Sequence, residues 1–193
     1  MRLLVITITL ISILACEENR VPRPVGYFRI DLPTKEYKRV DSIPFPFSFD
    51  LPQYARVNLT RTKDNEHFMN LDFIQFNARI HISYIPLDSN LETMLEDSRS
   101  LAYKHTVKAQ DIKERLYVND DKNVYGTYYQ IDGNAASGSQ FYLTDSSHHF
   151  VRGALYFHVE PNFDSIAPVQ EFIKKDIEHL IESFQWKSTQ APR

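Results

Sequence analysis

The chain has 193 residues, 42% of them hydrophobic, which is enough to form one globular domain of moderate size. Its formal net charge of −3 and the lack of a basic stripe argue against a surface that binds DNA or RNA, so we expect no nucleic-acid partner. Aromatic residues make up 13% of the chain and favour a strand-rich core, because tyrosine and phenylalanine pack well on a pleated sheet.

The N-terminus has the pattern of a bacterial lipoprotein export signal. Arg2 precedes an uncharged apolar run over residues 3–14, which is too short to span a membrane but has the length of a signal-peptide core. The run ends in the letters ILAC at residues 13–16, which is the arrangement of a lipobox, where the small Ala15 lets the peptidase reach the bond. We therefore predict that residues 1–15 are removed and that the Cys16 thiol carries the lipid.

Cysteine usage supports this interpretation. Cys16 is the only cysteine of the chain, so an internal disulfide cannot explain it, whereas lipid attachment can. The alternative is a soluble secreted protein whose signal happens to contain a cysteine. Residues 16–26 are polar and proline-bearing, which predicts a lipidated tether before the domain. No later apolar run reaches 18 residues, so we expect no spanning helix after the signal.

An arm rich in proline and aromatic residues opens the domain, which we place at residues 27–188. Residues 22–52 hold six of the ten prolines, and six tyrosines or phenylalanines lie among them. Because prolines restrict a strand to edges or irregular paths, the arm is predicted to lie extended across the domain and to end in an edge strand near residues 45–50. An exposed aromatic docking strip is the alternative.

The first strands and the first helix follow from periodicity. Polar and apolar residues alternate over residues 79–85, which predicts a strand that pairs with residues 67–74. Its inward side chains are predicted to be Ile80, Ile82 and Tyr84. Ser89 is the expected N-cap of a helix that starts near Leu91 and fades near His105.

The rest of the domain continues with strands and a closing helix. Strands are predicted over residues 112–118 and 124–131, followed by a loop at 133–138 and a hairpin of residues 140–143 and 150–159. Asp164 or Ser165 should cap a helix with an apolar stripe over residues 169–184, and residues 189–193 should form a flexible tail. This order predicts a single α+β domain with a mostly antiparallel sheet and two main helices.

The sequence contains no convincing pattern of a catalytic or metal site. Asp145, Ser147 and His149 are triad residue types, but neighbours in one turn rarely converge as a triad, and Asp and Ser there usually bond their own backbone. His148 and His149 are adjacent, and adjacent strand residues point to opposite faces. We therefore predict no catalytic residue, no metal site and no cofactor.

One region is predicted to be an interaction surface. Gln140, Tyr142 and Thr144 alternate along one arm of the hairpin, and Arg152 lies in the facing arm. A charge in the middle of a strand needs a partner if it is buried. Arg152 therefore either forms a structural ion pair with a carboxylate such as Asp145 or takes part in recognition.

Several blocks of the sequence resemble a known family. They are GYFRIDLP at residues 26–33, DGNAASGSQFYLTDS at 132–146, HFVRGALYF at 149–157, and PNFDS with the following PV at 161–169. These blocks resemble the GldD family of gliding motility lipoproteins from Bacteroidetes. A weaker likeness, in strand order and in residues 181–184, is to the PsbP/Mog1-type fold and bears on architecture only.

The resemblance implies a lipid-anchored envelope protein needed for gliding and for the linked type IX secretion apparatus. It implies no catalytic activity, and its expected partners are the membrane and other gliding and secretion proteins. The expected location faces the periplasm, with the outer membrane preferred over the inner. Two roles stay open: a non-enzymatic assembly or scaffold factor, and a carrier or enzyme acting on an envelope glycan or lipid.

Overall fold

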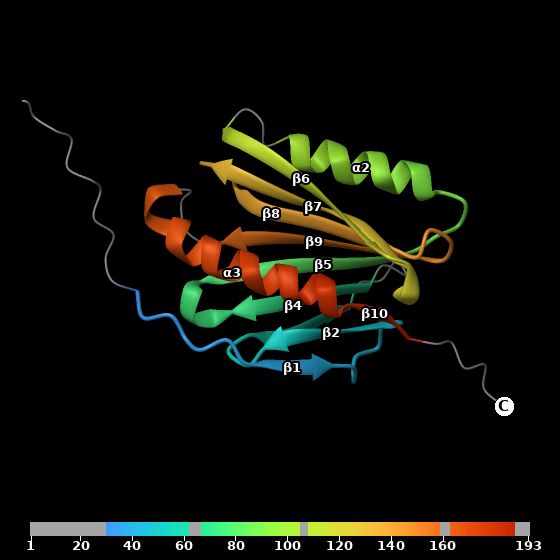
Figure 1. Cartoon of the computed structure of the whole chain (residues 1–193), viewed down its shortest axis with the longest axis horizontal. Helices are drawn as coiled ribbons and strands as arrows, with labels where there is room; N and C mark the ends of the chain where they lie inside the picture. The colour runs from blue at the N-terminus through green and yellow to red at the C-terminus, as the bar shows by residue number, and fades with distance from the viewer. Residues whose placement is uncertain (1–29, 62–66, 105–107, 159–162, 188–193) are drawn as a thin grey trace, which may run out of the picture.

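A computed structural model describes residues 30–61, 67–104, 108–158 and 163–187. The predicted signal, tether and tail, with Cys16, lie outside the described residues. The described chain forms two antiparallel sheets and two α-helices around one hydrophobic core (Figure 1), which confirms the predicted α+β class. No helix of the described part is long and apolar enough to cross a membrane.

The larger sheet has seven strands in the order β3-β4-β5-β9-β8-β7-β6. Their bounds are β3 (Arg56–Arg61), β4 (His67–Phe73), β5 (Ala78–Pro86), β6 (Ala109–Asn119), β7 (Val124–Gly133), β8 (Ser137–Thr144) and β9 (His149–Phe157). The predicted strand pair and hairpin are confirmed. Edge strand β3 was not predicted, although Val57 and Leu59 alternate with polar residues along it.

Short 3-10 turns join two of these strand pairs, η1 (Ile74–Phe76) and η2 (Asp120–Lys122). Each ends in an asparagine with left-handed backbone, Asn77 at φ 48° and Asn123 at φ 50°. Asparagine tolerates this conformation better than most residues, so the local sequence favours both tight connections.

The smaller sheet contains β1 (Tyr37–Val40), β2 (Phe47–Pro52) and β10 (Gln185–Trp186). β2 is its central strand, pairing with β1 on one side and β10 on the other. The predicted edge strand was therefore wrong, because the chain returns after the last helix to cover the second side. Pro46 and Pro52 lie beside or at the ends of β2, where they leave its middle free to pair.

The aromatic arm packs inward where it is described. Phe47, Phe49 and Leu51 are almost fully buried, and Phe47 stacks on Phe184 at a ring-centroid distance of 5.2 Å. The packing interpretation is confirmed for this part of the arm, whereas its first aromatic residues, Tyr27 and Phe28, lie outside the described residues.

The two helices are α2 (Leu91–Tyr103) and α3 (Phe163–Ser183). Both capping predictions were wrong. Ser89 has φ 56°, and Asn90 is the residue that precedes α2, while Asp164 and Ser165 lie inside the first turn of α3. The apolar stripe of α3 is confirmed by its buried residues Val169, Ile173, Ile177, Leu180 and Ile181.

The loop predicted at residues 133–138 is shorter than expected. Gly133 has φ +107°, a conformation that glycine adopts readily, but β8 already begins at Ser137. Gly138 therefore lies in a strand, where a Cβ atom would sit 2.4 Å from the Nε2 atom of Gln170 on α3. Any side chain at this position would therefore have to displace the buried amide group of Gln170.

The helices cover opposite faces of the larger sheet. Alternation along β7 and β8 turns Tyr128, Phe141 and Leu143 toward the core under α3, whereas Tyr142 and its alternate neighbours face α2. Figure 1 shows α3 lying across the front of the sheet, and α2 contacts β8 and β9. Thr127, Tyr142 and Arg152 lie on the α2 face, where they border two hollows.

A buried carboxylate joins the arm to α3. Asp176 accepts hydrogen bonds from Lys35 Nζ at 2.5 Å, Tyr37 Oη at 2.9 Å and Tyr54 Oη at 2.5 Å. Only 1% of the Asp176 side chain is exposed. Lys35 also donates to the Phe172 carbonyl at 2.9 Å, so one side chain ties the arm to both the carboxylate and the helix backbone.

Candidate functional site

The four residues of the predicted interaction surface lie on the α2 face of the sheet. Gln140, Tyr142 and Thr144 alternate along β8, and Arg152 is the register partner of Tyr142. Gln140 and Thr144 are, however, buried, with 2% and 3% exposure. Thr144 Oγ1 donates to the His149 carbonyl at 2.7 Å, which is a structural bond. Only Tyr142 and Arg152 can therefore offer atoms to a partner.

Arg152 does not form the expected ion pair with Asp145. Its Nη2 atom donates to Gln140 Oε1 at 3.0 Å. Asp145 instead accepts from the backbone N–H groups of Ser147, His148 and His149 at 3.1, 2.8 and 2.8 Å. Burial alone would raise the Asp145 pKa, but these three bonds hold it below its ordinary value. The turn-forming role predicted for Asp145 is confirmed.

The same turn lacks the geometry of a catalytic triad. Ser147 Oγ lies 2.8 Å from His148 Nδ1, and the Asp145 carboxylate approaches that same nitrogen at 3.6 Å. A triad requires the carboxylate on the ring nitrogen opposite the nucleophile. His148 is also 78% exposed at its side chain, so nothing fixes it as a base.

A hollow of 440 Å³ lies beside this turn. His148 and His149 both border this hollow. The two side chains were expected on opposite faces of a strand, which was wrong because His148 belongs to the turn before β9. His149 Nδ1 lies 2.9 Å from Tyr84 Oη, and its ring stacks on Trp186 at 5.1 Å. In the described part of the chain, no group of three or more His, Cys, Asp or Glu residues is placed to hold a metal ion.

His149 should make the fold less stable in mild acid. Burial lowers its pKa from the usual 6.5, His148 lowers it further, and Asp145 only partly opposes this. The unfolded chain therefore takes up the proton more readily. The His149 contribution to stability is full above pH 6.5 and falls as the pH drops from 6.5 through the folded-state pKa. Urea unfolding of wild type and His149→Gln across about pH 5 to 8 tests this.

His81, whose pKa is also lowered by burial, adds to the slope in both proteins. We expect His149→Gln to flatten the loss of stability below pH 6.5. His148→Gln, at the exposed neighbouring position, is the matched control and should change the slope less than His149→Gln, because it removes only the repulsion that His148 exerts on His149. Identical slopes for wild type and His149→Gln would rule out this role.

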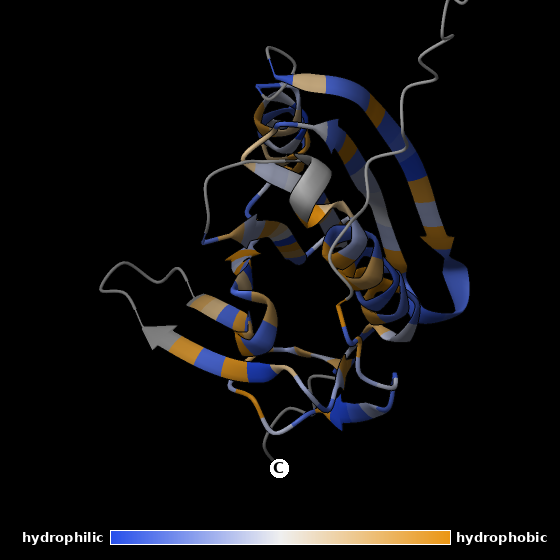
Figure 2. Cartoon of the chain, turned by 90° about the vertical axis from the view of Figure 1, so that its left-hand side faces the viewer, coloured by the Kyte–Doolittle hydropathy of each residue, from blue (hydrophilic) through white to orange (hydrophobic). Residues whose placement is uncertain are grey.

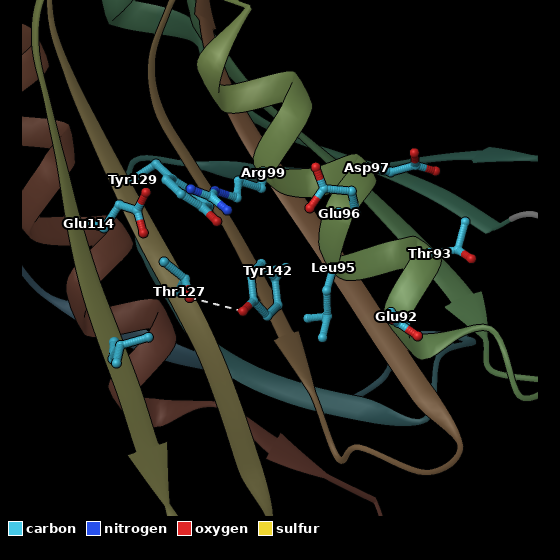
Figure 3. A pocket seen from close by; sticks show the side chains of 11 residues that line it. Glu92, Thr93, Leu95, Glu96, Asp97, Arg99, Glu114, Thr127, Tyr129 and Tyr142 are labelled. Atoms are coloured by element: carbon cyan, nitrogen blue, oxygen red, sulfur yellow. Dashed lines mark hydrogen bonds between the residues drawn. The ribbon is translucent and has the colours of Figure 1, made fainter.

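A cleft of 690 Å³ lies on the α2 face, between α2 and strands β6–β8. Its charged lining consists of four carboxylates and one guanidinium, those of Glu92, Glu96, Asp97, Glu114 and Arg99. Figure 3 shows Arg99 reaching from α2 toward Tyr129 and Glu114, while Leu95 points to Tyr142. Thr127 Oγ1 donates to Tyr142 Oη at 2.9 Å across the cleft floor.

The outer wall of the cleft is β6, the edge strand of the larger sheet. β6 pairs with β7, and no other strand of the described chain pairs with its outer side. Hydrophilic and hydrophobic residues form bands along it (Figure 2). Leu116 and Val118 are 75% and 65% exposed and share the cleft side of the strand with Glu114. An exposed apolar pair at an open sheet edge can bind another chain.

The residues of this cleft were not predicted from the sequence. Glu92 and Glu96 are four residues apart and so share one side of α2, while Glu114, Leu116 and Val118 alternate along β6. These two periodic patterns are readable in the sequence. What they do not reveal is that α2 and β6 lie on either side of one cleft.

Comparison with known proteins finds a matching family and a similar solved structure. Residues 17–186 match the family described as gliding motility lipoprotein GldD. Among solved structures, the solution structure of cyanobacterial PsbP (CyanoP) from Synechocystis sp. PCC 6803 is similar at TM-score 0.47 and 10% identity. That match covers 84% of this chain and 99% of the other. The comparison with curated proteins gives no match. Because the family match covers most of the chain, this protein belongs to the GldD family of gliding motility lipoproteins.

Proposed function

We propose that this protein is a non-enzymatic assembly factor for the gliding and type IX secretion apparatus, and that it binds an extended, basic segment of a partner protein along β6. The observation that carries the proposal is the open edge of β6 beside an acidic cleft. The proposed location is the periplasmic side of the envelope, with the outer membrane preferred over the inner.

Strand addition fits the backbone of β6. The strand is 11 residues long, and its outer side offers main-chain N–H and C=O groups to an incoming strand. Such hydrogen bonds supply affinity, whereas side-chain contacts supply specificity. Leu116 and Val118 would contact apolar residues of the incoming segment, removing two exposed side chains from water.

The charge of the cleft defines the partner. Glu92, Glu96, Asp97 and Glu114 outnumber Arg99, so the lining attracts lysine and arginine side chains. Glu114 already accepts a hydrogen bond from Tyr103 Oη at 2.5 Å, which fixes one carboxylate in place. A basic segment held along β6 would bring its cations over this lining.

The lipid anchor strengthens such a contact without enlarging it. A tether of polar residues before the domain holds it close to the membrane, so a membrane-bound partner is met at high effective concentration. A modest interface is then sufficient for assembly.

The test combines photo-crosslinking with complementation. A photoreactive residue at position 116 should capture a gliding or secretion protein in intact envelopes, with the crosslink mapping to an extended basic segment. The double variant Leu116→Lys, Val118→Lys should lower recovery of that partner by about tenfold or more and abolish gliding, because it places charge in an apolar contact and repels the basic segment.

Ile74 provides a matched control. It is 63% exposed on η1, far from β6 in the sheet order, so Ile74→Lys should leave both gliding and partner recovery intact. Normal gliding of cells that carry the folded Leu116→Lys, Val118→Lys protein would refute the docking site. Loss of gliding with full partner recovery would instead favour the carrier or enzyme role.

A further inference from the structure

A separate hollow of 330 Å³ lies on the α2 face across β5 and β9. It is lined by His81, Ser83, Arg152, Ala154 and Tyr156. The antiparallel register explains the grouping, because Ser83 is the partner of Arg152 and His81 is the partner of Ala154. Three polar side chains and one guanidinium therefore meet over two adjacent strands, several strands away from β6.

The guanidinium in this hollow lacks an acidic partner. Arg152 is half-buried and forms no ion pair with any carboxylate in the described ranges. Burial lowers the pKa of Arg152, while Tyr156 and the more distant Asp97 favour its charged form. Arginine stays protonated at neutral pH, so Arg152 carries a half-buried positive charge. The side-chain atom that accepts a hydrogen bond from it is the neutral amide oxygen of Gln140.

The surroundings of Arg152 hold more donors than acceptors. Gln140 uses Oε1 to accept from Arg152, and its buried Nε2 atom has no hydrogen-bond partner among the described residues. Ser83 and Tyr156 add hydroxyl groups to the wall. His81 is held by a contact of 2.7 Å between its Nδ1 atom and Asn70 Oδ1, which fixes the ring at the rim.

We propose that this hollow binds an oxyanion of the phosphate type, with Arg152 as its main contact. A guanidinium presents paired N–H groups that match two phosphate oxygens, and hydroxyl donors can satisfy the remaining ones. The volume of 330 Å³ admits a small group such as a phosphate ester and excludes a large ligand. The ligand is either the headgroup of an anionic phospholipid or a free phosphate ester.

The test uses the full lipidated chain in a neutral detergent. Binding of glycerol 3-phosphate is measured by calorimetry for wild type, Arg152→Lys and Arg152→Met. Loss of a charge-assisted contact should weaken binding by about tenfold or more in Arg152→Met and less in Arg152→Lys. Asp97→Asn is the matched control, because it removes a nearby negative charge and should strengthen binding.

Two further experiments identify where the phosphate group comes from and provide a variant in case Arg152→Met unfolds. Reconstitution in nanodiscs of phosphatidylcholine, with or without phosphatidylglycerol, shows whether a headgroup competes with glycerol 3-phosphate. Competition assigns the headgroup, and its absence assigns the soluble ester. Ser83→Ala provides a milder change if Arg152→Met unfolds, and it should weaken binding while keeping the melting temperature. The proposal is overturned if wild type binds neither form, or if folded Arg152→Met and Ser83→Ala bind as tightly as wild type.

Discussion

Replacing Asp176 by alanine should destabilise the fold by about 3 kcal/mol. The carboxylate is 1% exposed and accepts from Lys35, Tyr37 and Tyr54. Its removal leaves an ammonium and two hydroxyl groups without their acceptor, and desolvated donors without partners carry the cost. Lys35 is 24% exposed and can partly return to water, so the loss should fall at the lower end for a broken buried pair.

Urea unfolding of wild type, Asp176→Ala and Asp176→Asn measures this effect. Asparagine keeps one acceptor oxygen, so its loss should be smaller than that of alanine. Glu178→Ala on the same helix is the matched control. Glu178 pairs with Arg115 at 3.0 Å, but both side chains are partly exposed, so the cost should stay below about 1 kcal/mol. If Asp176→Ala also lowers the free energy of unfolding by less than about 1 kcal/mol, the packing of the arm does not depend on this carboxylate.

Replacing Cys16 by serine should abolish lipid attachment. Serine has no thiol to take the lipid, and each buried CH₂ of an acyl chain contributes about 0.8 kcal/mol to membrane binding. Loss of all acyl chains therefore removes the lipid's contribution to membrane binding. Labelling with a fatty-acid analogue should show no signal in Cys16→Ser, and fractionation should recover unprocessed precursor or protein without lipid.

Ala15→Gly is the matched control for Cys16→Ser. It keeps a small residue before the cysteine, so processing and labelling should continue. Equal labelling of Cys16→Ser and wild type would refute lipidation at this position. If the Cys16→Ser protein still accumulates and folds but its cells no longer glide, the lipid anchor itself is required for function.

Local patterns determined much of this fold. The alternation in residues 79–85 predicted the buried side chains of β5, and the apolar stripe of residues 169–184 predicted the buried side of α3. Both depend on neighbours two to four residues apart, so a single segment contains the information. Asp145 was likewise predicted as a turn former, because its hydrogen bonds reach only the next four residues. The family blocks, too, are properties of the sequence alone.

Only the tertiary structure decided which distant segments meet. β10 closes the second side of β2 across more than 130 residues, which turned a predicted edge strand into a central one. Arg152 contacts Gln140 rather than Asp145, because strand register sets which side chains are adjacent. The cleft between α2 and β6 arises in the same way. Strand register and long-range pairing are determined by the packing of the whole core. No single segment of the sequence therefore contains this information.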